Sequence, residues 1–393
     1  MRVLAALSLA AAAGPGAARA QAAYEETAEL RASQLLPADL LRGPHHEVEE
    51  AVESDGLVPV YRVRSEYGIF QARGEARLRE RIAEIEAMAA LRAARDSDAW
   101  SRAAERAGRA PASGGAAVAV PGLPVGVAPA GPPAAEAGAG RALDLEAARR
   151  RIAADLGVDP YTTNPALRRE LESHAWVAVA GGLSSGLIGR EAEPPAEARE
   201  ELPRVARLLR DWSTDDLVRL NRLELVAMGV DEPLREEFLT HPSYSPQTGT
   251  VLVDALSGLE GTGDRATFIE AAVAAASEDE AHEFRRMAEL IRGYDERSGR
   301  IERITTVDGR VAAFAADGTL VVPVLADHAL WTRRVADFAE SMARASGRDP
   351  ALARTRFLVS GRVSPRARSE IQGRGIEVTD GLAGGDAEGA PDP

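Results

Sequence analysis

The spacing of apolar residues changes its period near the start of the chain. From Leu57 to Gly74, in LVPVYRVRSEYGIFQARG, apolar and polar residues alternate on both sides of Ser65-Glu-Tyr-Gly68. A period of two around a turn predicts a β-hairpin. Directly afterwards, in EARLRERIAEIEAMAALRAAR, the apolar residues recur every three or four positions, which predicts a long amphipathic helix. A weaker helical pattern continues towards Arg106.

The residues before the hairpin predict two shorter helical pieces. Tyr24 to Leu36 has the pattern of a short amphipathic helix that ends at Pro37, since proline cannot continue a helix. ADLLRG predicts a further helical turn that stops at Gly43-Pro44.

The second half of the chain is dominated by helical patterns with marked beginnings. Asn164 stands before Pro165, and Ser213 and Ser277 stand before charged, amphipathic runs. Asparagine and serine are preferred N-cap residues, and proline is tolerated at the first helical position. The sequence therefore predicts several helices between about residue 144 and residue 294.

Strand patterns return towards the end of the chain. IERITTVDGRVAAFAADGTLVVPV contains Asp-Gly pairs at 308–309 and 317–318, which predict a three-stranded meander with tight turns. A helix then covers residues 330–342, followed by a strand, a helix and a strand in FLVSG, SPRARSEIQGRG and IEVTD. The predicted fold class is α+β and predominantly helical.

A change of composition divides the chain. Residues 108–140 are rich in Pro, Gly, Ala and Val and carry little charge, which predicts a linker that is partly extended and partly disordered. The predicted organisation is a signal peptide at 1–20, a hairpin and helix domain at 21–107, the linker, a helical α+β domain at 141–381 and a disordered tail at 382–393.

The first residues have the features of an export signal. Arg2 precedes an apolar run from Val3 to Ala13, and Ala18-Arg19-Ala20 has the small-x-small pattern of a signal-peptidase site. The run is too short to span a bilayer. We therefore expect a periplasmic or secreted protein. The chain has no Cys, so its folded state uses no disulfides.

Composition narrows the classes of partner and of chemistry. The formal net charge is −14, which argues against nucleic acids and anionic membrane surfaces as partners. All 47 basic residues are Arg. A P-loop lysine, a Schiff-base lysine and a Ser-Lys dyad are therefore excluded.

Several blocks carry a resemblance. LLPADLLRGPHH, DPYTTNPALRREL, RLNRLELVAMGV and FLVSGRVSPRARSEIQGRGIEV are similar to blocks of a family of uncharacterised exported bacterial proteins. The resemblance covers most of the chain after the signal. It implies export and one shared architecture, and it implies no activity, cofactor or catalytic residue.

The uncharged stretch 175–189 admits three interpretations. It contains Gly182-Leu-Ser184-Ser-Gly186, the pattern of a nucleophile elbow, but an elbow needs a preceding strand, and Pro165 to Trp176 predicts a helix. Its small residues would suit packing in lipid, although fifteen residues do not cross a bilayer. We prefer a buried helix against which other helices pack closely.

Two further motifs have weak chemical interpretations. Gly261-x-Gly263-x-x-Ala266 could seat a pyrophosphate if a strand preceded it, but Val251 to Leu259 has helical spacing, so we prefer a helix–helix turn capped by Asp264 or Thr262. In GPHHEVEE, His46 and Glu50 would have the spacing of metal ligands only on a helix. We prefer a solvated acidic turn there and predict no metal or cofactor.

The remaining candidate is the loop THPSYSP, which lies between predicted helices. His241, Ser243 and Tyr244 share this Pro-bounded loop, and loops often carry binding residues. A rigid turn in which Tyr244 packs and the hydroxyls cap the next helix is the alternative. We predict a non-catalytic interaction or scaffold protein with a protein partner in the cell envelope. The alternatives are a hydrolase built from distant residues, using Ser184 or the His241 loop, and a membrane-active protein using 175–189.

Overall fold

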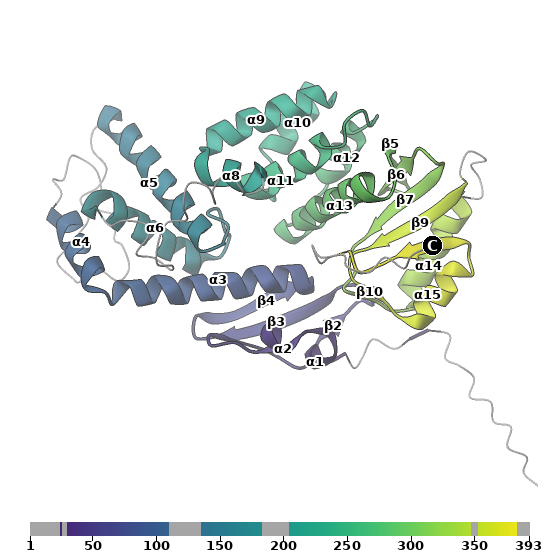
Figure 1. The fold of residues 1–393 in the computed structure, drawn as a ribbon, viewed down its shortest axis with the longest axis horizontal. Helices are drawn as coiled ribbons and strands as arrows, with labels where there is room; N and C mark the ends of the chain where they lie inside the picture. The colour runs from purple at the N-terminus through teal and green to yellow at the C-terminus, as the bar shows by residue number, and fades with distance from the viewer. Residues whose placement is uncertain (1–23, 26–29, 110–134, 183–203, 347–352, 383–393) are drawn as a thin grey trace, which may run out of the picture.

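The structure is a computed structural model that describes residues 24–25, 30–109, 135–182, 204–346 and 353–382. Helices account for most of these residues, and the longer strands form two sheets, one from the first part of the chain and one from the last (Figure 1). The predicted α+β, predominantly helical fold is therefore confirmed.

The first sheet packs against the long helix α3 (Gly74–Arg95). Its central strand β3 (Pro59–Ser65) pairs antiparallel with β4 (Gly68–Arg73), which confirms the predicted hairpin. Alternate residues of β3 are buried, so Tyr61 and Val63 enter a core that also contains the apolar stripe of α3. The short strands β1 (His46–Val48) and β2 (Glu53–Ser54) pair with the other side of β3.

This core continues into helices that follow the predicted linker. Side chains of α3 share one buried cluster with side chains of α4, α5 and α6. Helix α4 begins after a two-residue break at Asp96 and Ser97, and α5 already includes the last residues of the range predicted as linker. These helices are α4 (Asp98–Arg109), α5 (Ala135–Asp155) and α6 (Pro165–Gly181).

Helix α6 contains the beginning of the uncharged stretch 175–189. Ala175 and Val177 are buried, and a Cβ on Gly181 would lie 2.1 Å from the carbonyl oxygen of Ala103 in α4. A small residue is therefore required where the two helices meet. Gly182, with φ +64, ends the helix, and Ser184 lies outside the described residues.

The segment before the hairpin is less helical than predicted. Of the predicted helix from Tyr24 to Leu36, only the single turn α1 (Ala32–Leu35) is helical among the described residues. Leu30 and Arg31 are instead tied to the strand region, since the amide of Val52 donates to the carbonyl of Leu30. Helix α2 (Ala38–Leu41) confirms the second predicted turn.

Helices from the middle of the chain surround a second core, and the helix starts predicted at Asn164, Ser213 and Ser277 are correct. The Asn164 side chain accepts from the amides of Ala166 and Leu167, and Ser213 and Ser277 accept from amides in the first turns of their helices. The helices are α8 (Arg204–Asp211), α9 (Thr214–Ala227), α10 (Glu232–Leu239), α11 (Pro246–Ser257), α12 (Ala266–Ala272) and α13 (Glu278–Arg297).

The second sheet joins two parts that the sequence predicted separately. The meander and the terminal strand–helix–strand form one five-stranded sheet in the order β11-β9-β7-β6-β5, with β7, β9 and β11 parallel. Asp308 and Gly309 both have positive φ, as a tight hairpin turn requires. The strands are β5 (Ile301–Val307), β6 (Arg310–Ala315), β7 (Thr319–Val324), β9 (Arg354–Val359) and β11 (Ile376–Thr379).

Helices cover both faces of this sheet. Val321 of β7 belongs to the core shared with α13, whereas its neighbours Leu320 and Val322 belong to a third core with α14 (Arg333–Ser346) and α15 (Pro365–Gln372). All six residues of β7 are therefore buried, as expected for a central strand of a sheet that helices cover on both faces. Figure 1 shows α13 on one side of the sheet and α14 with α15 on the other.

The first part of the chain packs against this sheet at the end where β7, β9 and β11 have their carboxyl termini; this end of the sheet is called the docking edge. Beyond β7, the amide of Asp327 donates to the carbonyl of Leu57, and the amide of Leu330 donates to the carbonyl of Gly56. Two short parallel strands, β8 (His328–Ala329) and β10 (Arg362–Val363), extend the same edge. The beginning of α3 thus lies next to the ends of β7 and β9.

Candidate functional site

The carboxyl ends of the parallel strands meet at this docking edge. Asp327 follows β7, Ser360-Gly361 follows β9, and Asp380-Gly381 follows β11. In sheets with parallel strands, ligands bind outside the carboxyl ends of the strands, because loops from neighbouring strands converge there. A ligand site is therefore expected at this edge.

Ser360 and Gly361 hold the loops after β7 and β9 together. The buried Ser360 hydroxyl donates to the carbonyl of Ala326 (2.9 Å) and accepts from the amide of the same residue (3.0 Å). The Gly361 amide also donates to Ala326, at 2.6 Å. A Cβ on Gly361 would lie 2.4 Å from the Asp327 carbonyl oxygen, so only glycine permits this approach. The backbone on both sides of Asp327 is thereby fixed.

The Asp327 carboxylate caps the beginning of α3. Its Oδ2 accepts from the amide of Glu75 at 2.5 Å, where the helix leaves amides unpaired and its dipole favours a negative charge. Gly74 has φ +83, a conformation that suits glycine, and a Cβ there would lie 3.3 Å from the same oxygen. Burial and the Glu75 charge raise the pKa of Asp327 to about 6, against the opposing effects of this hydrogen bond and of Arg286.

A cleft of about 520 Å³ opens at this edge. Pockets of this size hold small ligands. Three Arg side chains and two carboxylates line it, drawn from α3, α13 and the loops after β7 and β9, and Gly361 and Gly381 bring backbone to its surface. The charged residues are Glu75, Arg79, Arg286, Asp327 and Arg362.

The three Arg residues of the cleft differ in their partners. Arg79 pairs with Glu75 at 2.6 Å, and Arg362 donates to the carbonyl of Leu35. The half-buried Arg286 guanidinium makes no hydrogen bond and no ion pair within the described part of the chain, although it faces the charge of Asp327. Arg286 is therefore the cation with the most free hydrogen-bonding capacity at the cleft.

A buried tyrosine lies behind the same edge. Tyr61 is fully buried in β3, and its hydroxyl has no hydrogen-bond partner among the described residues. Burial and the nearby charges of Asp327 and Glu75 raise its pKa. A buried polar group without a partner is rare and usually has a functional or solvent-related reason. Tyr61 is near enough to Asp327 to feel its charge, but it belongs to the core and not to the lining of the cleft.

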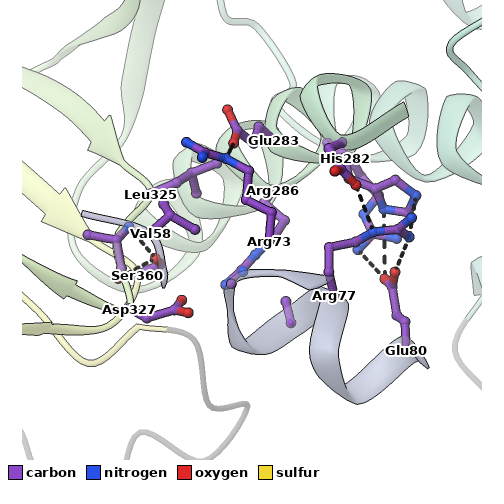
Figure 2. Close-up of a pocket in the computed structure, with 15 residues that line it drawn as sticks. Val58, Arg73, Arg77, Glu80, His282, Glu283, Arg286, Leu325, Asp327 and Ser360 are labelled. Atoms are coloured by element: carbon purple, nitrogen blue, oxygen red, sulfur yellow. Dashed lines mark hydrogen bonds and ion pairs between the residues drawn. The ribbon is translucent and has the colours of Figure 1, made fainter. Parts of the chain in front are cut away.

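A smaller cavity of about 30 Å³ continues from the cleft towards α13 (Figure 2). It shares Arg286, Asp327 and Ser360 with the cleft, and its far wall contains Arg77, Glu80 and His282. The cavity therefore connects the cleft with a second group of charged side chains.

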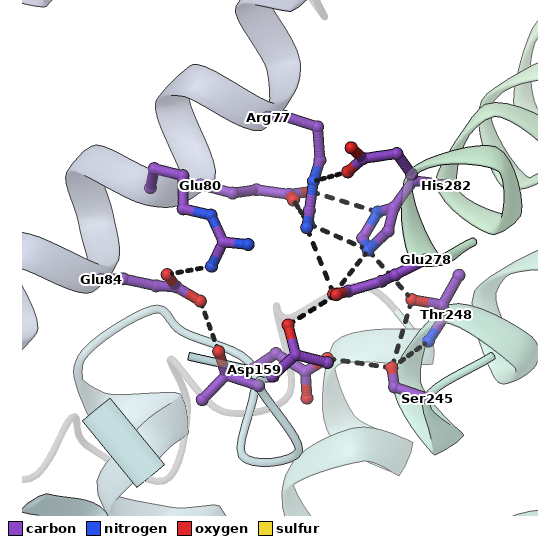
Figure 3. Close-up of polar contacts among 12 residues, drawn as sticks. Arg77, Glu80, Glu84, Asp159, Ser245, Thr248, Glu278 and His282 are labelled. Atoms are coloured by element: carbon purple, nitrogen blue, oxygen red, sulfur yellow. Dashed lines mark hydrogen bonds and ion pairs between the residues drawn. The ribbon is translucent and has the colours of Figure 1, made fainter. Parts of the chain in front are cut away.

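This second group, the Arg77 network, ties α3 to α13 (Figure 3). The Arg77 side chain is 11% exposed and donates to Glu80, Glu278 and Asp279 at 2.5–3.2 Å. It also lies 3.0 Å from His282 Nε2. Because a guanidinium can only donate, Nε2 accepts, so a neutral ring carries its proton on Nδ1, 3.7 Å from Glu80.

Charges in the Arg77 network compensate one another. Burial would raise the pKa of Glu278, but the close contact with His282, the hydrogen bond from Thr163 and the Arg77 charge lower it to about 2. Burial also opposes ionisation of Glu80, and the charges of His282, Arg285 and Arg77 lower its pKa nevertheless. The geometry is that of a satisfied ion-pair network that joins two helices.

Asp159 lies at the end of this network. Its two carboxylate oxygens accept from the amide of Tyr161 (2.7 Å) and from the hydroxyl of Ser245 (3.0 Å). Burial raises the pKa of Asp159 to about 6 despite these bonds. No serine hydroxyl donates to a histidine anywhere in the described ranges, so the hydrolase alternative gains no support from them.

The structure places the predicted loop residues in a turn that uses their polar atoms internally. The Tyr244 hydroxyl donates to Ala272 (2.9 Å), the Ser243 hydroxyl donates to Ala275 (3.1 Å), and His241 Nδ1 accepts from the Ser243 amide. Tyr244 packs on Phe238. The packing of Tyr244 agrees with the rigid turn that the sequence allowed as an alternative, but the Ser243 hydroxyl does not cap the next helix, which Ser245 caps instead. A binding role for the three residues stays a prediction.

The glycine motif at 261–266 is a turn, but its predicted caps are wrong. The Gly263 amide donates to the carbonyl of Glu302 in β5, so it is not free for a phosphate. Arg265 occupies the N-cap of α12 without a capping bond. The Thr262 hydroxyl donates to Ile301 instead, because the turn is drawn against the strand.

The segment GPHHEVEE is not a solvated turn at His46. His46 begins β1 and is 5% exposed, because pairing with β3 turns its side chain towards Gly43. His45 contacts Glu66 at 3.0 Å. Among the described residues, no three His, Asp or Glu side chains are arranged to hold a metal ion.

The described helices also bear on the membrane interpretation of 175–189. None of them combines the length and the apolarity that crossing a bilayer requires.

The cleft residues were missed by sequence reasoning because they come from distant segments. The available signal is a short polar or glycine-containing sequence directly after a buried strand: LADH after β7, VSGR after β9 and VTDG at the end of β11. That signal becomes informative once the strands are known to be parallel.

Comparison of the chain with protein-family models, curated proteins and solved structures found no match. The resemblance to exported bacterial proteins therefore stays a prediction.

Proposed function

We propose that the protein is an exported, non-catalytic binding protein that holds a small ligand with an anionic group in the cleft at the carboxyl ends of β7 and β9. The observation that carries the proposal is the half-buried Arg286, whose guanidinium has no hydrogen-bonding partner among the described residues and lines a cleft of about 520 Å³. Arginine binds carboxylates and phosphates through charge-assisted, often bidentate hydrogen bonds.

The position and construction of the cleft support this proposal. It lies where parallel-strand loops converge, and its floor is fixed by Ser360 and Gly361. The chain as a whole carries a net charge of −14, whereas the cleft lining has three cations and two anions. The local excess of positive charge favours an anion at this one place.

Titration calorimetry with inorganic phosphate, succinate and citrate tests the proposal. We expect at least one of them to bind with a Kd of about 1 mM or lower, and Arg286→Gln to abolish that binding. Arg292→Gln is the matched control, because Arg292 lies on the same helix but pairs with Asp254 and Glu296 away from the cleft. Equal binding by both variants would reject the cleft as the site.

A second candidate function is contact with a protein partner in the cell envelope. Leu223 and Val226 lie one turn apart on α9 and are 68% and 53% exposed. Apolar side chains exposed together on one helix face favour a protein interface over solvent. Leu223→Ser with Val226→Ser would leave ligand binding in the cleft unchanged and weaken partner capture from envelope extracts by a tagged chain.

A further inference from the structure

The cleft presents two opposite charges that do not pair with each other. Arg286 and Asp327 both line it, and the field of Arg286 acts on Asp327. Their charged atoms nevertheless form no ion pair, so they lie farther apart than the distance of about 4 Å that defines one. Each keeps unused hydrogen-bonding capacity.

The atoms that have no hydrogen-bonding partner can be named. Asp327 Oδ2 accepts from the Glu75 amide, while Oδ1 accepts no hydrogen bond within the described ranges. Arg286 has all its guanidinium donors free there. The fully buried Tyr61 hydroxyl, near Asp327, is a third polar group without a partner. Arg286 and Asp327 line the cleft itself, whereas Tyr61 is buried in the core of the first sheet.

We infer that the ligand is amphoteric: an acidic group binds Arg286, and an ammonium or other N–H group of the same molecule donates to Asp327 Oδ1. This rests on the proposed function. A purely anionic ligand would meet the repulsion of Asp327 and Glu75, and a purely cationic one that of Arg79, Arg286 and Arg362. A molecule with both groups satisfies both sides of the cleft.

A series of matched probes tests the inference. The ω-amino carboxylates from glycine to 8-aminooctanoate would be titrated into the full chain. Each would be compared with the carboxylate that lacks the amine and with the amine that lacks the carboxylate. We expect one length to bind at least about tenfold more tightly than either counterpart, since a charge-assisted hydrogen bond contributes on that scale. The best length reports the separation of the two groups in the site.

Two variants assign the ends of the ligand. Arg286→Gln should lose the amino carboxylate and the plain carboxylate alike. Asp327→Asn should lower the affinity for the amino carboxylate to that for the plain carboxylate, because the neutral amide can still cap α3 but no longer attracts an ammonium. Arg292→Gln serves as the control. Circular dichroism and thermal unfolding would show that each variant is folded.

The outcomes separate the two proposals. If plain carboxylates bind as tightly as amino carboxylates and Asp327→Asn changes nothing, the amphoteric ligand is rejected while the binding cleft stands. If neither class binds and phosphate, succinate and citrate also fail, the binding cleft is rejected and the inference falls with it.

Discussion

Two regions of this molecule use the same charged residues in opposite ways. In the Arg77 network, one guanidinium is shared by Glu80, Glu278, Asp279 and His282. In the cleft a short distance along α3 and α13, Arg286 and Asp327 face one space without pairing. Satisfied networks join elements of a fold, whereas unsatisfied charges that share a cleft are free to meet a ligand.

The two regions also differ in how they shift the pKa of a carboxylate. Glu278 is held ionised, with a pKa of about 2, by its partners in the network. Asp327 has a pKa of about 6, because burial outweighs its single hydrogen bond and the charge of Arg286. A raised pKa at a cleft is more informative about function than a lowered one inside an ion-pair network.

The largest loss of stability is expected when the Arg77 network is broken. Arg77→Gln would leave Glu80, Glu278 and Asp279 without their shared counter-charge. Removing one partner of a buried network costs about 3–5 kcal/mol. Urea unfolding should show a loss on that scale, while Arg79→Gln, which removes an exposed cation from the same helix, should cost under about 1 kcal/mol. Equal losses would mean that the Arg77 network contributes little stability.

The next effect concerns the floor of the cleft. Gly361→Ala would place a Cβ 2.4 Å from the Asp327 carbonyl oxygen and should destabilise the fold by about 1–3 kcal/mol. Gly249→Ala in α11 is the control, since its Cβ would meet only Tyr244, at 4.0 Å. A tolerated alanine at 361, measured by thermal unfolding, would show that the two loops can separate.

An effect of similar size depends on pH. The raised pKa of Asp159 means that the folded chain keeps this proton up to about pH 6, whereas the unfolded chain releases it near the ordinary value of 3.8. As the pH rises from about 4 to about 6, the free energy of unfolding therefore decreases, and the shift of about two pKa units sets the contribution of Asp159 at up to about 3 kcal/mol. Asp159→Asn should remove that part of the decrease. Parallel urea titrations at pH 4, 5, 6 and 7 would measure it, and an unchanged slope would contradict the assignment.

The smallest effect on stability is expected at the proposed ligand contact. Arg286→Gln removes no hydrogen bond within the described residues, so its free energy of unfolding should stay within about 0.5 kcal/mol of the unaltered chain. A much larger loss in urea unfolding would show that Arg286 supports the fold, and the contrast with Arg77 would disappear.

Local patterns predicted the elements well. The caps at Asn164, Ser213 and Ser277, the hairpin from Pro59 to Arg73, and the Asp308-Gly309 turn depend on residues a few positions apart, so the sequence contains their signals directly. The helix expected before Pro37 failed in its described part, because hydrogen bonds to the neighbouring strand region override the local preference there.

The candidate site is formed by pairing between strands that are distant in the sequence, and local hydrophobic patterns do not predict such pairing. The parallel pairing of β7 with β9 spans a whole helix, and it alone brings Asp327 next to Ser360. Arg286 and Glu75 reach the same cleft from α13 and α3, so their roles appear only after three cores have been assembled. The buried His46 was missed for the same reason, since its burial follows from pairing with β3.

The ligand cleft is tested most directly by calorimetric titration of the unaltered chain and of Arg286→Gln at pH 7 with the same series of anions and amino carboxylates. We expect saturable binding of at least one probe to the unaltered chain and its loss in Arg286→Gln, with both proteins equally stable. The same binding curve for both proteins, or no binding to the unaltered chain, would contradict the claim that the cleft at the ends of β7 and β9 is a ligand site.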